Sequence, residues 1–541
     1  MRKLEQIQLN KLISAYGGVG SIIETNTNGS LIILPYDQWK CFVNVNQNPM
    51  EIMDNRLLSY VRTHGYPNVT RLVPIPDNDL SKSVYSATNA NVGTTVSSKY
   101  FPEWYYCPHC RRLYKLSEWE FLWDNTFPND HGFSINVPAC CFCSRQINAN
   151  KISRYPLQQI RFVMASLSGD MEDVPFDRLW ENNPNGGAWQ VGNIMNAARN
   201  LRYRSRRGDG DGLQNLFIEN ADTHSRIYLS QIERNYIINK DKANKDKAYK
   251  MVVRGSQSLY FPEIVRSLYI PMEASDNINA QNTDELDLHE FRYLTNDGNF
   301  NENMIVKDDL VVRRRPELTM PFISRISAIE RLKETSVLLS YTRMGKYGEP
   351  RQWYNVGQQA ESQGETAMSK CPFGDGSPQA AIMSTYMPAV ESYGEGVLFE
   401  VDLNSIQPDD YETFVHTFCH IVMKELEFQC GYPLTSLKEK IYIDNDNSKG
   451  GFLIYTIAGS EGSYGGLISL TQNGKIIDLI NRGAERARYC PNDPICSSEH
   501  EAHCFACLDL PETACIKFNA KLNRRLFLER WFNPRPNGLV L

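Results

Sequence analysis

The spacing of the cysteines is the feature that most constrains the fold of this chain. Ten of its fourteen cysteines fall in two short stretches, five within residues 107–143 and five within residues 490–515. The chain has no run of about 18 apolar residues, and its first residues lack the apolar segment of a signal peptide. We therefore expect a cytoplasmic protein whose thiols stay reduced, so that clustered cysteines indicate metal sites rather than disulfides.

The first cluster has the spacing of a zinc ribbon. Cys107-Pro-His-Cys110 and Cys140-Cys-Phe-Cys143 form two close pairs separated by 29 residues. Each CxxC turn places two thiolates on one side of a tetrahedral Zn²⁺ ion. The sequence predicts Cys107, Cys110, Cys140 and Cys143 as ligands, with Cys141 as a substitute for Cys140 or Cys143. The competing interpretation is a set of buried free cysteines.

The second cluster holds five thiols, one more than a tetrahedral site needs. Cys504, Cys507 and Cys515 are the tightest group, and we predict Cys496 as the fourth ligand, with Cys490 or His503 as substitutes. Neither cluster shows an open position beside a glutamate base, which favours structural zinc over hydrolytic zinc. The predicted cofactor is therefore zinc at two structural sites.

Length and composition indicate a folded protein of several domains. The chain has 541 residues, of which 42% are hydrophobic and 22% charged, close to the globular average. We predict a mixed α/β, multi-domain fold with an inserted zinc ribbon and a C-terminal α/β domain closed by a zinc site of four cysteines. The predicted divisions are an N-terminal α/β region (1–100), the zinc-ribbon insertion (101–150), a middle region with a polar loop at 205–250 (151–330), and a C-terminal zinc-binding domain (331–541).

The clearest predicted helix lies in the C-terminal third. It starts after Pro408 with Glu412 as a capping-box partner, shows apolar residues at helical spacing, and stops at Gly431. His416 and His420 lie one turn apart on it, the spacing at which two imidazoles can share a metal ion. Because the segment lacks the glutamate of HExxH and no third ligand is in view, we interpret them as a packed pair.

A strand, a glycine-rich loop and a second helix are predicted to follow. The apolar run at 451–458 is typical of a buried strand, and residues 474–488 form a helix that leads into the cysteines. A loop at the end of a buried strand is where open α/β sheets bind ligands, although a simple turn is the favoured interpretation. The residues that would form such a site are Ser460, Glu461 and Tyr464.

Several of these segments resemble known families. The His416–His420 segment, the strand at 451–456, the loop at 459–467 and the Cys504–Arg524 segment are similar to the zinc-binding domain of MrfA-type DNA-repair helicases, in which four cysteines hold a structural zinc. Other segments along most of the chain resemble the DrmB subunits of the DISARM anti-phage defence system. These are Tyr16–Ser21, Arg56-Leu57, Arg161–Val163, Asp173–Pro175, Arg254–Pro262, Glu330–Leu332, Pro388–Glu391 and Gly394–Gly396.

The resemblance implies a bacterial defence complex in which a DrmA-like helicase chain works with this one on DNA. The present chain has no Walker A motif, so ATP hydrolysis is expected in that partner. Two features depart from the family pattern. Ser168-Gly169-Asp170 replaces a Gly-His pair, and residues 200–255 contain no cysteines, so we expect no middle zinc site.

We therefore predict a non-catalytic DNA-binding and helicase-partner subunit, stabilised by zinc and not bound to a membrane. A net charge of −6 argues against a protein that coats nucleic acid through overall positive charge. It does not exclude a local basic surface that binds nucleic acid. Basic residues near the second cysteine cluster are the candidate nucleic-acid contacts. They are Arg486, Arg488, Lys517, Lys521, Arg524 and Arg525, with Arg482 as a further candidate and Arg111 and Arg112 beside the first cluster.

Two alternatives belong to other classes. In a metal-dependent nuclease, carboxylates with His416 and His420 or with Glu461 would form the site. Such an enzyme needs convergent acids to hold Mg²⁺. Glu400 and Asp402 resemble a strand-borne acidic pair, but no lysine at the expected spacing completes the pattern. A protein-interaction scaffold without DNA contact is the third hypothesis.

Overall fold

The structure is a computed structural model with mixed α/β architecture, which confirms the predicted class. It describes residues 12–14, 17–25, 29–39, 41–42, 51–75, 96–130, 138–148, 151–178, 200–206, 212–232, 249–271, 282–344, 368–374, 378–431, 433–457, 466–498, 502–511, 513–515 and 517–532. No helix within these ranges is long and apolar enough to cross a membrane.

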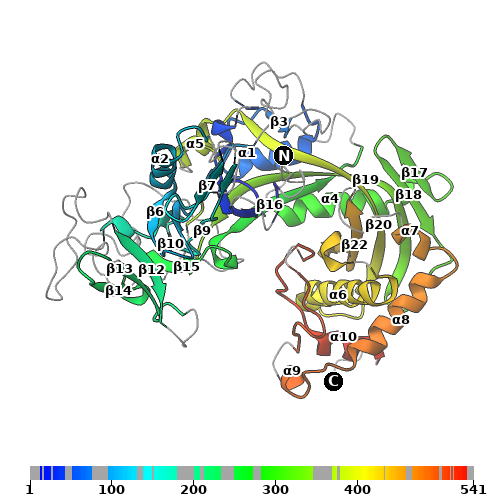
Figure 1. Cartoon of the computed structure of the whole chain (residues 1–541). Helices are drawn as coiled ribbons and strands as arrows, with labels where there is room; N and C mark the ends of the chain where they lie inside the picture. Colours follow the sequence, from blue (N-terminus) through cyan, green and yellow to red (C-terminus); the bar gives the residue numbers. More distant parts are fainter. Residues whose placement is uncertain are drawn as a thin grey trace, which may run out of the picture.

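Two long antiparallel strands connect the two halves of the molecule (Figure 1). They are β19 (Ile323–Thr342) and β20 (Tyr386–Asp402), and each changes its outer neighbour along its length. Residues 326–331 of β19 pair with β18 (Leu310–Arg315), whereas residues 334–342 pair with β16 (Phe261–Leu268). Residues 386–389 of β20 pair in parallel with β3 (Arg71–Pro74), and residues 394–402 pair with β22 (Lys449–Ile457).

This eight-stranded sheet is completed by β17 (Met304–Lys307) and β21 (Leu437–Asp444) at the two ends of the order β17-β18-β19-β20-β22-β21. The predicted boundary between residues 330 and 331 therefore falls inside β19, and strands from the predicted middle and C-terminal regions share one sheet. A continuous ladder of backbone hydrogen bonds joins regions that composition alone had separated.

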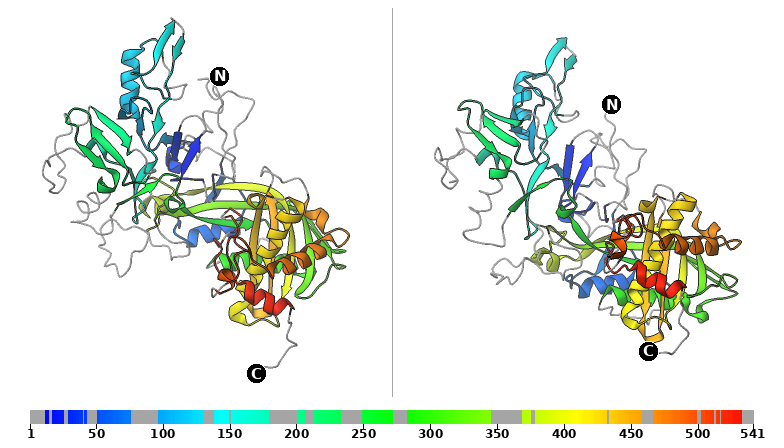
Figure 2. Two further views of the ribbon diagram at one scale, coloured as in Figure 1. Left: turned by 60° about the horizontal axis from the view of Figure 1, so that its bottom comes forward. Right: turned by 90° about the horizontal axis from the view of Figure 1, so that it is seen from below.

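The C-terminal half of the sheet is covered on both faces. The helix α6 (Tyr411–Cys430), with α8 (Lys475–Ala487) and α10 (Arg524–Phe532), covers one face, and α4 (Thr283–Thr295) covers the other (Figures 1 and 2). On β22, Phe452 and Ile454 pack towards α6, whereas Leu453 and Tyr455 belong to the core beneath α4. Burial of both faces explains the uninterrupted apolar run of this strand.

The predicted secondary structure of this half is confirmed, with one correction. The helices α6 and α8 and the strand β22 lie where the periodicity placed them, and α6 ends at Gly431 in a left-handed conformation with φ of 69°. Glu412 does not form the predicted capping box. Its carboxylate instead accepts hydrogen bonds from Lys517 and Lys521, which come from the C-terminal segment.

The N-terminal half contains a second apolar core around β3, β16 and the helix α1 (Asn55–Thr63), with the short helix α5 (Pro378–Met383) nearby. Smaller sheets surround it. They are β1 (Ile22–Thr25) with β2 (Gly29–Ile33) and β4 (Ser98–Tyr100); β10 (Phe162–Ser166) with β11 (Met171–Asp173) and β15 (Tyr249–Val253); and β12 (Leu201–Ser205) with β13 (Leu216–Asn220) and β14 (Arg226–Tyr228). The segment predicted as a polar loop at 205–250 thus contributes two paired strands, while residues 207–211 and 233–248 lie outside the described residues.

Two segments that resembled DrmB, Tyr16–Ser21 and Arg254–Pro262, meet around Arg343 together with the Ser168–Asp170 segment that departs from the family pattern. This buried guanidinium donates to the carbonyl oxygens of Gly20 at 2.6 Å, Gly169 at 3.0 Å and Leu259 at 2.5 Å. In the loop before Gly20, Gly18 has φ of 128°, and a Cβ there would lie 2.6 Å from the hydroxyl of Tyr260. The glycines of this loop are therefore required for close packing.

Candidate metal centres

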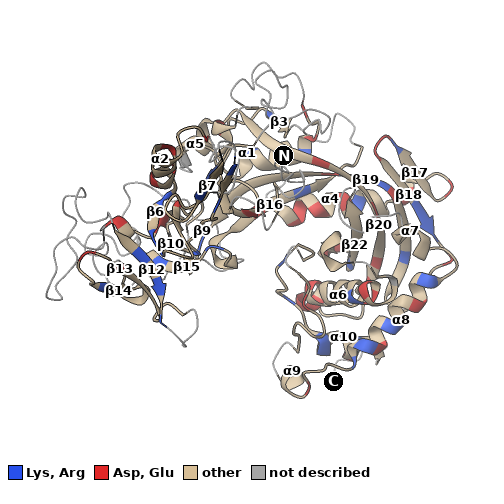
Figure 3. Cartoon of the chain, in the orientation of Figure 1, with Lys and Arg blue, Asp and Glu red and all other residues tan. Residues whose placement is uncertain are grey.

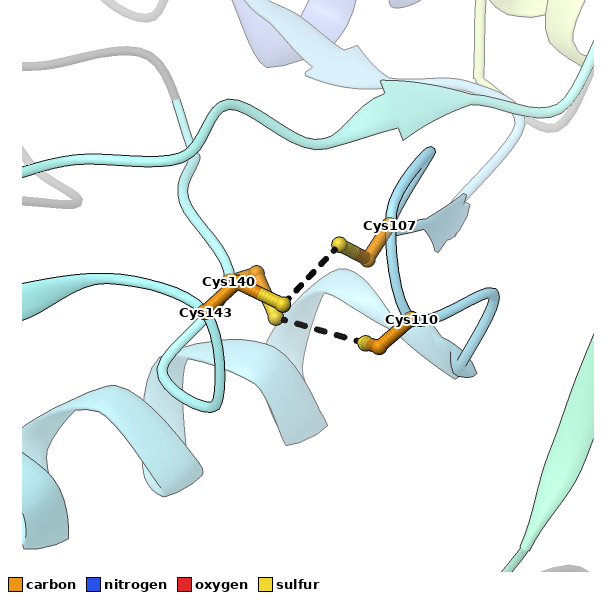
Figure 4. A group of neighbouring side chains, drawn as sticks. All are labelled: Cys107, Cys110, Cys140 and Cys143. Carbon is orange, nitrogen blue, oxygen red and sulfur yellow. Dashed lines mark hydrogen bonds between the residues drawn. The ribbon is translucent and has the colours of Figure 1, made fainter.

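The first cysteine group lies in a small module built from β5 (Trp104–Tyr106), β6 (Leu113–Lys115), β9 (Gln158–Gln159), α2 (Leu116–Thr126), β7 (Arg145–Asn148) and β8 (Lys151–Ser153). The turn between β5 and β6 carries Cys107 and Cys110, and the turn before β7 carries Cys140 and Cys143. The four thiols point towards one another from these two turns (Figure 4).

The distances in this group fit a tetrahedral ion. The Sγ atoms of Cys107 and Cys143 are 3.8 Å apart, and those of Cys110 and Cys140 are 3.7 Å apart. Four Zn–S bonds of about 2.3 Å require S–S separations of about 3.8 Å. The predicted four residues are thus brought together and positioned to hold a metal ion, and Cys141 lies outside the group.

Backbone hydrogen bonds shape both turns of this module. The amide of Arg111 donates to the carbonyl of Cys107 at 2.8 Å, and the amide of Ser144 donates to the carbonyl of Cys140 at 3.0 Å. The neighbouring thiol of Cys140 lowers the pKa of Cys110 to about 4, because a hydrogen bond stabilises the thiolate. The thiolate is the form that binds metal.

The second group differs from the prediction in one member. Its thiols belong to Cys490, Cys496, Cys504 and Cys507, with Sγ–Sγ distances of 3.5 Å for 490–504, 3.8 Å for 496–507 and 3.9 Å for 504–507. These distances also fit a tetrahedral thiolate site. Cys490 therefore occupies the place that spacing had given to Cys515.

The path of the chain after Cys507 explains this correction. Leu508 and Leu510 are both buried in the core beneath α6, so the chain turns away from the second group before it reaches Cys515. His503, the other substitute that the sequence offered, donates from Nδ1 to the carboxylate of Asp509 at 2.8 Å and is not part of the group.

Cys515 lies instead in a third group with His416, His420 and Glu439, all four of them buried. His416 and His420 project from α6, and Glu439 projects from β21. Glu439 faces both imidazoles, with Nε2 of His416 3.1 Å from its Oε1 and Nε2 of His420 3.2 Å from its Oε2. The sequence interpretation was a packed histidine pair with no third ligand in view. It missed Glu439 because a single glutamate between lysines in a strand carries no local signal of a site.

Two of the candidate nucleic-acid contacts lie at the end of α8, where Figure 3 shows Lys and Arg residues. Arg486 forms an ion pair with the buried Glu425 at 3.1 Å, and its guanidinium stacks on the ring of Phe428. Arg488 forms an exposed ion pair with Glu485 at 3.2 Å. Both arginines keep exposed surface while they contact the helix layer.

The other candidates divide into exposed and buried residues. Lys517 and Lys521 both bind Glu412, and the exposed Arg525 donates to the carbonyl of Ser497. Arg524 is 3% exposed and contacts Asp493 at 2.7 Å, so the structure places it inside the C-terminal domain. A buried arginine cannot reach a phosphate, and Arg524 is therefore withdrawn from the candidate contacts.

Basic residues beside the first group and acidic residues of β20 were also named from the sequence. Arg111 is exposed, and Arg112 stacks on the ring of Phe142 with its guanidinium carbon 3.8 Å from the ring centre.

Glu400 faces Arg325 at 3.6 Å, and Asp402 accepts a hydrogen bond from the amide of Asn404. The pair is not part of any group of potential metal ligands among the described residues. The predicted loop site of Ser460, Glu461 and Tyr464 lies outside the described residues.

The chain is similar to a known family and to a known protein. Residues 8–261 match a family described as a domain of unknown function, DUF8724. The chain is also similar to the DISARM protein DrmB of Bacillus paralicheniformis, with 24% identity over an alignment of 639 positions. The match covers 95% of this chain and 100% of that protein. The resemblance that the separate segments indicated is thus confirmed along the chain at modest identity, and the chain is DrmB-like.

Proposed function

We propose that this chain is a non-catalytic, zinc-stabilised subunit of a bacterial anti-phage defence complex that binds DNA together with a separate, DrmA-like helicase chain. The observation that carries the proposal is the similarity to the DISARM protein DrmB over the whole length of that protein. The match covers 95% of this chain and is therefore not confined to one module. It supports a role in defence for the chain as a whole.

The two four-cysteine groups support a structural role for zinc. Cys107 and Cys110 lie in a turn between three-residue strands, and the segment around Cys504 and Cys507 is formed by turns. The turns that carry the thiols are irregular, and ligation of a metal ion would stabilise them, in the first module together with the small apolar core around Trp119 and Trp123. With four thiolates each, the groups leave no ligand position for a substrate or water.

The donor chemistry favours a binding subunit over a nuclease. Among the described residues, the three groups of potential metal ligands contain one carboxylate, Glu439, which is buried. Two-metal nucleases hold Mg²⁺ with several convergent carboxylates that remain open to the phosphate.

The exposed basic residues at the ends of α8 and α10 are the proposed contacts to DNA. Arg488 pairs with an exposed glutamate, and Arg525 pairs with a backbone carbonyl. Exposed pairs of this kind contribute about 0–1 kcal/mol, so a phosphate can replace the protein partner at small cost. The metal group formed by Cys490, Cys496, Cys504 and Cys507 fixes the segment that lies between these two helices.

The proposal is tested by DNA binding of the assembled complex at several salt concentrations. The double variant Arg488→Ala and Arg525→Ala should bind more weakly, and the slope of log K against log salt should decrease by about 1.8, since each phosphate contact in duplex DNA contributes about 0.9. The matched control is Arg313→Ala, a half-buried arginine of β18 that pairs with Glu330 at 2.7 Å. Equal slopes for all three proteins would contradict the proposed surface.

Incubation with labelled single- and double-stranded DNA and Mg²⁺ or Mn²⁺ separates the functional classes. A binding subunit leaves the DNA intact, whereas cleavage by the purified chain would establish a nuclease. If the chain binds no DNA even with the helicase chain present, a protein-interaction scaffold is the remaining function.

A further inference from the structure

We propose that His416, His420, Glu439 and Cys515 hold a third metal ion, of the Zn²⁺ class, inside the C-terminal domain. The ligand atoms of these four residues all lie within 4.8 Å of one another. They come from α6, from β21 and from the segment that follows the second cysteine group. Their side chains converge although the residues span 100 positions in the sequence, from 416 to 515.

The hydrogen bonding of His420 leaves a free nitrogen lone pair directed into the group. Its Nδ1 lies 3.0 Å from the carbonyl oxygen of Leu508. A carbonyl only accepts, so Nδ1 carries the hydrogen, and Nε2 of the neutral ring is unprotonated. A hydrogen bond from one ring nitrogen to a backbone carbonyl is the usual support of a histidine that binds metal through its other nitrogen.

The atoms opposite that lone pair also lack partners. The Nε2 of His420 lies 3.2 Å from Oε2 of Glu439, yet neither atom has a hydrogen-bond partner among the described residues. A nitrogen lone pair and a carboxylate oxygen repel each other at this distance. A cation between them removes the repulsion and satisfies both atoms.

The remaining distances fit the same ion. The Nε2 of His416 lies 3.1 Å from Oε1 of Glu439 and 3.4 Å from Sγ of Cys515. In a tetrahedral zinc site, bonds of about 2.0–2.3 Å place nitrogen about 3.4 Å from oxygen and about 3.6 Å from sulfur. The observed separations are within about 0.3 Å of these values, so ligation needs only a small outward shift.

Charge and burial identify the type of ion and its role. Two imidazoles, one thiolate and one carboxylate form a borderline donor set that suits Zn²⁺ better than Mg²⁺ or Ca²⁺, which prefer oxygen ligands. All four side chains are at most 1% exposed. The four ligands leave no open position, so the ion would be structural and would join α6 to β21 and to the C-terminal segment.

The test is a count of metal ions per chain. The full chain, expressed with added Zn²⁺ and purified without chelators, should contain three zinc ions by native mass spectrometry and elemental analysis. Cys515→Ala and Glu439→Gln should each contain two. The matched control is Cys371→Ala, which removes another buried thiol that is remote in sequence from the group and should retain three. Three ions in the Cys515→Ala protein would overturn the proposal.

X-ray absorption at the zinc edge tests the wild-type chain itself, so the proposal does not depend on whether a variant folds. Two four-cysteine sites present eight ligands, all of them sulfur, whereas three sites present nine sulfurs among twelve ligand atoms. A nitrogen and oxygen shell beside the sulfur shell is the expected result. Two ions per wild-type chain with sulfur as the single shell would refute the third site and leave the proposed role in defence unaffected.

Discussion

Substitution of Arg524 separates a structural role of this residue from a role in DNA binding. Its side chain donates to the carbonyl oxygens of Ala502 and Ala487, each at 3.3 Å, and its second terminal nitrogen contacts Asp493 and, at 3.9 Å, the Sγ of Cys496. Arg524 thus connects the start of α10 to the end of α8 and to the second cysteine group. The guanidinium also lies beside the second cysteine group, whose four thiolates would carry net negative charge around a divalent ion.

The cost of Arg524→Ala follows from the two carbonyl contacts. A hydrogen bond from a charged donor contributes about 1.5–3 kcal/mol, and we take the lower end for each because both distances are long. The expected loss is about 3 kcal/mol in the free energy of unfolding, or a decrease of roughly 6–12 °C in Tm for a domain of about 150–250 residues. The second zinc ion should also be released at a lower chelator concentration.

Calorimetry, together with chelator titration, provides the assay, and Arg525→Ala is the control. Arg525 is the next residue, is exposed and makes one backbone contact, so its loss should change stability by less than about 0.5 kcal/mol. The opposite outcome would be an Arg524→Ala protein with the free energy of unfolding and the zinc affinity of the wild type, in a complex that has lost affinity for DNA. That result would refute the structural assignment and return Arg524 to the nucleic-acid surface.

Two further predictions concern the first cysteine group and a buried carboxylate. Cys107→Ser should lose one zinc ion and become sensitive to proteolysis within residues 101–150, whereas Cys141→Ser should retain the ion, because this thiol lies outside the group. Burial opposes ionisation of Glu334, but Lys438 and Arg266 outweigh it and hold its pKa at about 2, below the usual 4.5. This carboxylate therefore stabilises the fold by about 3 kcal/mol above pH 4.5, a contribution that is lost as the pH falls from 4.5 through 2. Urea unfolding of Glu334→Gln should show this loss at pH 7 and a smaller difference from wild type at pH 3, and equal differences at both values would contradict it.

The sequence predicted those elements whose signal is local. The apolar residues of α6 recur at helical spacing, and Gly431 ends the helix because it adopts a conformation that other residues disfavour. In the same way, Cys504 and Cys507 could be grouped because two thiols in one turn must lie close together. Glu412 could not be assigned correctly, since its partners Lys517 and Lys521 are about 100 residues away in sequence.

The complete ligand sets depend on tertiary structure and so exceeded what spacing can predict. Cys515 is closer in sequence to Cys507 than Cys490 is, and this proximity favoured the wrong partner. Burial of Leu508 and Leu510 directs the chain towards α6, and Cys515 therefore lies away from the second cysteine group. The number of thiols was a better indication of the second ligand set. A tetrahedral site takes four thiolates, so one of the five cysteines in this cluster had to lie elsewhere.

The strand β21 gives an independent reason to expect a cation beside Glu439. Its adjacent residues Glu439 and Lys440 are each 1% exposed, and they point to opposite faces of the sheet. Lys440 is neutralised in the layer of α4, where it forms ion pairs with Asp287 at 2.7 Å and with Glu290. On the α6 side, Glu439 meets two imidazoles and a thiol, none of which carries a fixed positive charge. Burial of an uncompensated carboxylate costs several kcal/mol, so the same physical requirement that pairs Lys440 with acids calls for a metal ion next to Glu439.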